Sequence, residues 1–255
     1  MKKIVLMLAF LISVGMVTGC GDDSSSDEKS SSSSQVQESD NADESLSSSS
    51  QVQENDTEDE NSSSNEAQSD SNTEFERGSV ENGVYTSDFA NVKFTAPDGW
   101  EFANDEYIAT MMNLGLEVTE NNNDLTKAML EQTTIYDAMC LEQSTGKNLI
   151  FMFENLAKEV PDPSKFTVED YASALDQQFS SAANVSVTNK SDIEHVTLNG
   201  EDYIKQTYTI NYETLGAETK QTYYARKIGN YVLGIIASPG STSDDMSVYE
   251  ENFNN

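Results

Sequence analysis

Two short apolar runs, Leu149-Ile-Phe-Met-Phe153 and Tyr231-Val-Leu-Gly-Ile-Ile-Ala237, decide the fold of this chain. Neither run alternates between apolar and polar residues, so each predicts a strand that is covered on both faces. Turn signals precede both runs, Ser144-Thr-Gly-Lys147 before the first and Gly229-Asn230 before the second. We therefore expect each run to form a central strand of its sheet.

The segments around these two runs carry the pattern of strands joined by short turns. The expected strands are residues 88–95, 133–141, 148–153, 185–198, 203–212, 219–228 and 231–237. Asn199-Gly200 is the preferred pair for a type I′ hairpin, and the extended segment before it is expected to be interrupted near Ser191-Asp192. Short hairpin connections of this kind favour an antiparallel sheet.

Three helices are expected, each from an N-cap residue that precedes acidic residues in the first turn. The N-caps are Asn104, Thr167 and Ser243. The helix after Thr167 is the clearest, because its apolar residues Val168, Tyr171, Ala172, Leu175, Phe179 and Ala182 recur at helical spacing. The first helix should bury Tyr107, Ile108, Met111, Met112 and Leu114. A loop over residues 121–124 and a short helix near residues 125–130 complete the prediction.

The resulting order of elements is β-α-(α)-β-β-α-β-β-β-β-α, which predicts one α+β domain over residues 80–255 with a mainly antiparallel sheet and helices on its faces. This order, the sequence Pro97-Asp98-Gly99-Trp100 and the late run of strands resemble the PsbP-like (Mog/PsbP/DcrB-type) α/β/α sandwich. The resemblance covers residues 84–255. It implies a binding or assembly protein, and it brings no catalytic residues with it.

The N-terminus indicates export and lipid anchoring. Lys2 and Lys3 precede an apolar run that is too short to span a bilayer comfortably, which is typical of a signal peptide over residues 1–19. Val17-Thr18-Gly19-Cys20 resembles a bacterial lipobox, which implies that Cys20 is acylated, as with palmitate, and becomes the mature N-terminus. The lipid on Cys20 would then hold the protein at the extracytoplasmic face of the bacterial membrane. The alternative is an ordinary cleaved signal with an incidental cysteine.

Residues 20–79 are predicted to be a disordered acidic linker, since Ser, Asp, Glu, Asn and Gln dominate them. The polar sequence of residues 31–38 recurs at residues 47–54, which indicates a replicated tether. The whole chain has a formal net charge of −31. Such a chain is repelled by phosphate backbones, so nucleic acid is not expected as a partner.

Neither a catalytic site nor a metal or cofactor site is expected. The only histidine, His195, falls in a predicted surface strand, and Cys140 falls in a predicted core strand without a cysteine partner once Cys20 is acylated. Zinc sites draw on Cys and His ligands that are too few here. Residues 121–124 lack the ligands of a calcium loop, whereas paired carboxylates for glycoside hydrolysis stay open because spacing alone does not test them.

Tyrosines are concentrated in the last third of the chain, and they allow two interpretations. One is ordinary strand packing, and the other is an aromatic face that binds a partner or a glycan. The candidate partner-binding residues are Tyr203, Tyr208, Tyr212, Tyr223 and Tyr224. The function expected is a non-enzymatic binding or assembly module for an envelope protein or a cell-wall component. The alternatives are a cell-envelope hydrolase with paired carboxylates and a low-affinity binder of divalent cations.

Overall fold

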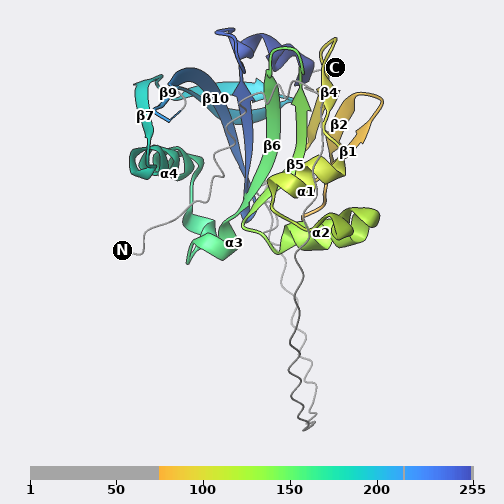
Figure 1. Cartoon of the computed structure of the whole chain (residues 1–255). Coiled ribbons are helices and arrows are strands. Elements are labelled where there is room, and N and C mark those ends of the chain that lie inside the picture. Colours follow the sequence, from red (N-terminus) through yellow and green to blue (C-terminus); the bar gives the residue numbers. More distant parts are fainter. Residues whose placement is uncertain (1–74, 215, 254–255) are drawn as a thin grey trace, which may run out of the picture. The chain divides into compact units, whose positions relative to one another are not determined.

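The structure, a computed structural model, describes residues 75–214 and 216–253. The predicted signal peptide, Cys20 and nearly all of the predicted linker lie outside these described residues. The described residues form an α+β fold with mostly antiparallel sheets and helices packed against them, as the sequence predicts (Figure 1).

The larger sheet has the two apolar runs at its centre. Its strands, in spatial order, are β4 (Glu101–Phe102), β5 (Thr134–Leu141), β6 (Asn148–Asn155), β11 (Tyr231–Ser238), β10 (Ala217–Ile228), β9 (Glu201–Tyr212) and β7 (Val185–Lys190), and β8 (Glu194–Leu198) also pairs with β9. All these pairs are antiparallel. Every residue of β6 is buried, and so is every residue of β11 after Tyr231. The predicted central strands are thus confirmed.

A second, three-stranded sheet corrects the prediction for the start of the domain. It consists of β1 (Ser79–Glu81), β2 (Val84–Ser87) and β3 (Val92–Thr95). The sequence predicted one strand over residues 88–95, but residues 88–91 are a turn between β2 and β3. Asn91 at this turn has a positive φ of 48°, which asparagine tolerates better than most residues and which ends an extended strand.

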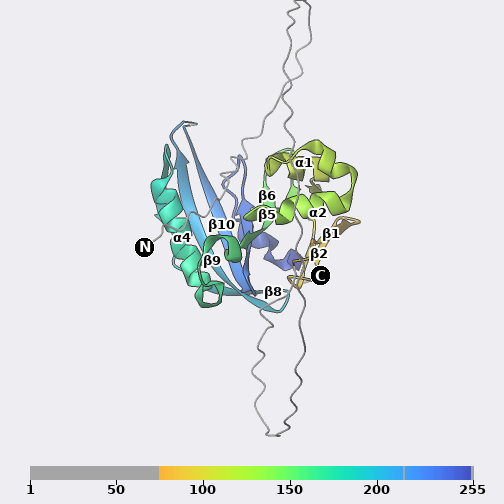
Figure 2. The same cartoon turned by 90° about the horizontal axis from the view of Figure 1, so that it is seen from below.

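In chain order, the described helices are α1 (Asp105–Met111), η1 (Leu116–Glu120), α2 (Asn122–Leu130), α3 (Leu156–Glu159), η2 (Pro163–Lys165), α4 (Val168–Ser181) and η3 (Met246–Phe253), where η marks a 3₁₀-helix. Helix α4 lies at one end of the large sheet, and α1 and α2 lie at the other end (Figures 1 and 2). Helix α4 packs against β7, β9 and β10, whereas α1 and α2 pack against β5. The terminal helix η3 contacts β3 of the small sheet.

The capping predictions are confirmed for two helices and wrong for the third. Asn104 accepts a hydrogen bond from the backbone N–H of Tyr107 at 2.9 Å, and Thr167 forms a capping box with Asp170. Tyr107 itself is 48% exposed, because the short α1 buries only Ile108 and Ala109. The terminal helix is a 3₁₀-helix that starts at Met246, too far from Ser243 for that residue to cap it. The predicted loop over residues 121–124 is instead the start of α2, capped by Asn121.

Replacing Thr167 by alanine should lower the free energy of unfolding by about 1 kcal/mol, because it leaves the first-turn N–H of Asp170 without its side-chain acceptor. Thr167→Ser keeps the hydroxyl and should stay close to the wild type. Urea unfolding, followed by the fluorescence of the single tryptophan, Trp100, measures both variants. Equal losses in the two variants would contradict the capping argument.

The core includes Phe75, which lies five residues before the predicted domain boundary at Val80. The Phe75 side chain is 4% exposed, and its ring lies 5.1 Å from that of Phe153 on β6 and 5.3 Å from that of Phe89 in the β2–β3 turn. The residues assigned to the end of the linker are therefore part of the core. The sequence did not predict this, because one phenylalanine hardly changes the average hydrophobicity of a segment that is otherwise polar.

Arg77 and Gly78 attach the same segment to a buried carboxylate. Asp137 lies at a β-bulge in β5, and its side chain has no solvent exposure. Its Oδ2 accepts hydrogen bonds from the N–H of Gly78 at 2.9 Å and the hydroxyl of Tyr85 at 2.6 Å, and the Arg77 Nε lies 3.6 Å from its Oδ1. Burial raises the pKa of Asp137, while these three neighbours oppose the rise.

Candidate functional site

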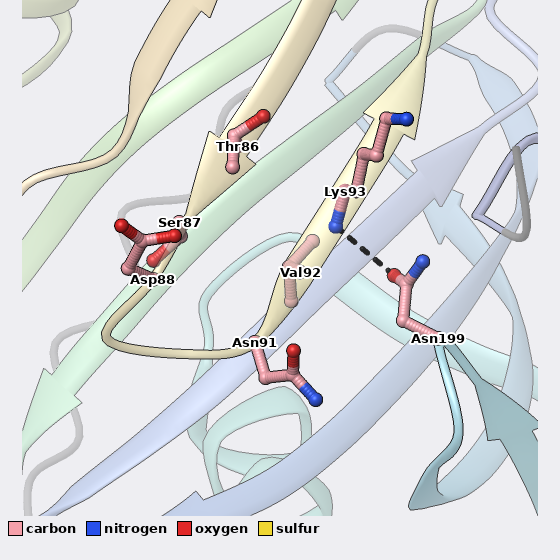
Figure 3. Close-up of a pocket in the computed structure, with 7 residues that line it drawn as sticks. All are labelled: Thr86, Ser87, Asp88, Asn91, Val92, Lys93 and Asn199. Carbon is pink, nitrogen blue, oxygen red and sulfur yellow. Dashed lines mark hydrogen bonds between the residues drawn. The ribbon is translucent and has the colours of Figure 1, made fainter.

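A polar pocket lies between two turns of the domain, the β2–β3 turn (residues 88–91) and the β8–β9 turn (Asn199-Gly200). It has a volume of about 440 Å³. Its lining residues are Thr86, Ser87, Asp88, Asn91, Val92, Lys93 and Asn199 (Figure 3). All of these except Val92 are polar or charged residues, so hydrogen bonds and charge can hold a ligand here besides the apolar contact that the side-chain stems provide.

Local contacts determine the shape of the β2–β3 turn. The Ser87 hydroxyl accepts a hydrogen bond from the Ala90 N–H at 3.2 Å, and the Asn91 N–H donates to the Asp88 carbonyl at 3.3 Å. Phe89 points into the core, where its ring lies 5.6 Å from that of Phe153 and packs edge-on. These contacts leave the polar side chains of Asp88 and Asn91 at the surface.

The two turns are joined directly to each other. Asn199 Oδ1 accepts a hydrogen bond from the Lys93 N–H at 3.1 Å (Figure 3), and the Asn91 side-chain amide donates to Glu201 Oε1 at 2.8 Å. Arg226 on β10 supports both turns, since it donates to Glu201 Oε2 at 2.6 Å and to the Ala90 carbonyl. The pocket is therefore held in place before any ligand binds.

Several polar groups of the pocket are left for a ligand. In the described part of the chain, no hydrogen bond or ion pair engages the carboxylate of Asp88, the ammonium of Lys93 or the amide nitrogen of Asn199. The carboxylate can only accept hydrogen bonds, while the ammonium and the amide nitrogen can only donate. The pocket thus offers both donors and acceptors to one ligand.

The pocket does not provide the groups that metal binding or carboxylate-pair chemistry needs. It contains one carboxylate, that of Asp88. Over residues 75–214 and 216–253, no cluster of three or more His, Cys, Asp or Glu side chains is placed to hold a metal ion. The cation-binding alternative therefore gains no site from these residues, and the pocket supplies no carboxylate pair for the hydrolase alternative.

The five candidate partner-binding tyrosines do not form a surface, and this corrects the aromatic-face hypothesis. Each of them is 6% exposed or less: Tyr203, Tyr208, Tyr212, Tyr223 and Tyr224. Tyr223 and Tyr224 point to opposite faces of β10, and both are buried. Tyr208 and Tyr212 lie on the buried face of β9. The hydroxyls of Tyr208 and Tyr223 donate within the domain, for example from Tyr223 to Gln221 Oε1 at 2.8 Å. Ordinary strand packing is the interpretation that holds.

The other two residues considered for chemistry lie where the sequence predicts. Cys140 on β5 is fully buried, and burial raises the pKa of its thiol to about 12, so it stays in the unreactive protonated form. His195 on β8 has an exposed side chain whose Nδ1 lies 3.3 Å from Asp202 Oδ2. No nucleophile is paired with this histidine among the described residues.

Sequence reasoning missed the pocket because two distant turns form it. The sequence pattern predicts the hairpin at Asn199-Gly200, but it predicts a strand over the residues that include Asp88 and Asn91. Asp and Asn are turn formers, and their spacing of three residues was the signal that could have located the β2–β3 turn.

No family model matches the chain, and no curated protein matches it in sequence. No helix in the described ranges is both long and apolar enough to cross a membrane. The lipidation site Cys20, predicted from the lipobox, lies outside those ranges.

Proposed function

We propose that this protein is a non-enzymatic binding module and that its pocket binds a hydroxyl-rich component of the cell wall. In this proposal, a lipid on Cys20 holds the protein at the extracytoplasmic face of a bacterial membrane. The lipobox and the acidic tether support the location. The resemblance to PsbP-like binding and assembly proteins supports the class of function.

The pocket between the two turns is the observation that carries this proposal. A sugar hydroxyl both donates and accepts a hydrogen bond, so it matches a site that presents the Asp88 carboxylate beside the donors of Lys93 and Asn199. An anionic ligand fits less well, because residues 80–255 contain 28 acidic against 10 basic residues. The tyrosines support neither a protein partner nor a glycan, because all five are buried.

The test measures binding of soluble disaccharide–peptide fragments, released from purified bacterial wall, to the full chain by calorimetry. Asp88→Asn removes the charge of the acceptor and should weaken binding about tenfold or more, since a hydrogen bond to a charged group contributes about 1.5–3 kcal/mol. Asn199→Asp keeps the oxygen that accepts from the Lys93 N–H but removes the donor, so it should weaken binding as well.

The matched control is Asp98→Asn, an exposed aspartate in the turn before Trp100 that does not line the pocket. It removes the same charge from the surface without changing the pocket, and it should bind as the wild type does. Equal weakening by Asp88→Asn and Asp98→Asn would show a general charge effect and contradict the pocket. No heat of binding with any fragment would contradict the ligand class.

A further inference from the structure

Glu154 is a fully buried carboxylate on the face of the sheet that α4 covers. It belongs to β6, where it pairs with Thr134 on one side and Val232 on the other. Alternation along β6 places it on the same face as Met152. There, Met152 and the hydroxyl of Tyr171 from α4 both lie over Gly234, 3.4 and 3.1 Å from where a Cβ of that residue would stand.

The surroundings of Glu154 do not compensate a negative charge. One oxygen, Oε2, accepts a hydrogen bond from the Thr134 hydroxyl at 2.8 Å. The other oxygen, Oε1, is buried and has no hydrogen-bond partner in the described chain, and the same holds for the hydroxyl of Tyr171. Burying an ionised carboxylate in such a place costs much free energy. The neutral form, which carries a proton on one oxygen, costs less.

Asp137, on the neighbouring strand β5, is a buried carboxylate with different surroundings. Asp137 has Arg77, the Tyr85 hydroxyl and the Gly78 N–H around it. Among the described residues, no cation is found to act on Glu154. Burial raises the pKa of Glu154 well above its ordinary value of 4.5, and the nearby carboxylate of Glu159 raises it further, against the effect of Thr134.

We propose that Glu154 is a pH-sensitive switch: in its neutral form it allows α3 and the start of α4 to close over β6, and loss of its proton opens this corner of the domain. The location supports a local effect, because Glu154 is followed directly by Asn155, the N-cap of α3. An ionised Glu154 reaches water only if the chain that covers it moves away.

The groups packed around Glu154 determine the direction of the pH effect. They are Thr134 on β5, Glu159 on α3 and Tyr171 on α4, and Tyr171 in turn has Tyr136 of β5 and Tyr223 of β10 near it. The pKa values of Tyr171 and Tyr223 are raised well above 10 by burial, so both phenols stay neutral. An ionised Glu154 would therefore have a second carboxylate and neutral hydroxyls as its neighbours, and these do not stabilise its negative charge.

The sign of the effect follows from proton linkage. Above pH 4.5 the unfolded chain has released the proton of Glu154, while the folded chain keeps it because its pKa is raised. Each further pH unit then lowers the folding equilibrium constant by up to about tenfold through this residue, until the folded pKa is reached. In Glu154→Gln this contribution is absent, so the variant should become more stable than the wild type as the pH rises.

The test compares the full wild-type chain with Glu154→Gln between pH 5 and 9, using urea unfolding for global stability and trypsin cleavage at Lys158 and Lys165 for local opening. Both lysines are exposed and flank the connection from α3 to α4. The rate of cleavage at these sites in the wild type, relative to Glu154→Gln at the same pH, should rise with pH. Glu154→Leu carries neither a titrating group nor an amide, so it should show the same pH dependence as Glu154→Gln if the effect comes from the carboxyl of Glu154 and not from the amide.

Parallel pH profiles in the wild type and both variants would overturn the proposal, because Glu154 would then carry no pH dependence. The proposal would also be overturned if the free energies of unfolding of the wild type and Glu154→Gln diverged with pH while the ratio of their cleavage rates at Lys158 and Lys165 stayed constant. The effect would then be on global unfolding and not on the opening of this corner. Divergence of both measurements supports the switch.

Discussion

Replacing Asp137 by alanine should lower the free energy of unfolding by about 3–5 kcal/mol, the range seen when one partner of a buried ion pair is removed. The variant leaves the Tyr85 hydroxyl and the Gly78 N–H without their acceptor. It also removes the buried carboxylate beside the Arg77 guanidinium, whose side chain is 13% exposed and which keeps Asp105 and Asn122 as partners. Urea unfolding followed by the fluorescence of Trp100 measures the loss.

Tyr85→Phe is the matched control for this network. It removes only the hydrogen bond to Asp137 and should cost about 1 kcal/mol. In the double variant Tyr85→Phe/Asp137→Ala, no hydroxyl is left unpaired, so the double variant should lose less than the sum of the single losses. Additive losses would show that the two residues do not act together and would contradict the network.

Phe75→Ala should lower the free energy of unfolding by about 3–5 kcal/mol, the usual cost of a buried phenylalanine. The expected loss is large for a residue at the very start of the fold, because its ring contacts those of Phe89, Phe153 and Tyr231 in the core. Urea unfolding of the full chain tests it.

The neighbouring variant Glu76→Ala is the control, since Glu76 is exposed and such substitutions stay within about 0.5 kcal/mol. If Phe75→Ala behaved as Glu76→Ala does, the domain would begin after Phe75, as the composition of the linker predicts. A chain that begins at Val80 lacks Phe75 and Arg77 together and should be less stable than either Phe75→Ala or the full chain.

Local signals in the sequence were sufficient for most of the secondary structure. The N-cap residues Asn104 and Thr167, the hairpin at Asn199-Gly200 and the apolar runs of β6 and β11 all depend on neighbours a few residues away, and each is found as predicted. Alternation also placed Tyr208 and Ile210 correctly, on the face of β9 that packs into the core.

Features that depend on distant residues could not be predicted in this way. The pocket needs Asn91 and Glu201 to meet, and the core needs Phe75 to reach β6. Tyrosine spacing shows which side chains share a face of a strand, but it does not show whether another layer covers that face. The lipid anchor on Cys20 stays a prediction from its motif, outside the described residues.

The position of β11 has a consequence for how the protein is made. A ribosome completes β6 well before it starts β11, yet these two strands pair along their whole length at the centre of the sheet, from Asn155 with Tyr231 to Asn148 with Ser238. Until β11 emerges, β6 presents an unpaired apolar edge, the kind of surface that chaperones bind and that aggregates form on. A chain that ends prematurely, before Tyr231, therefore lacks the middle of its sheet and not merely its rim.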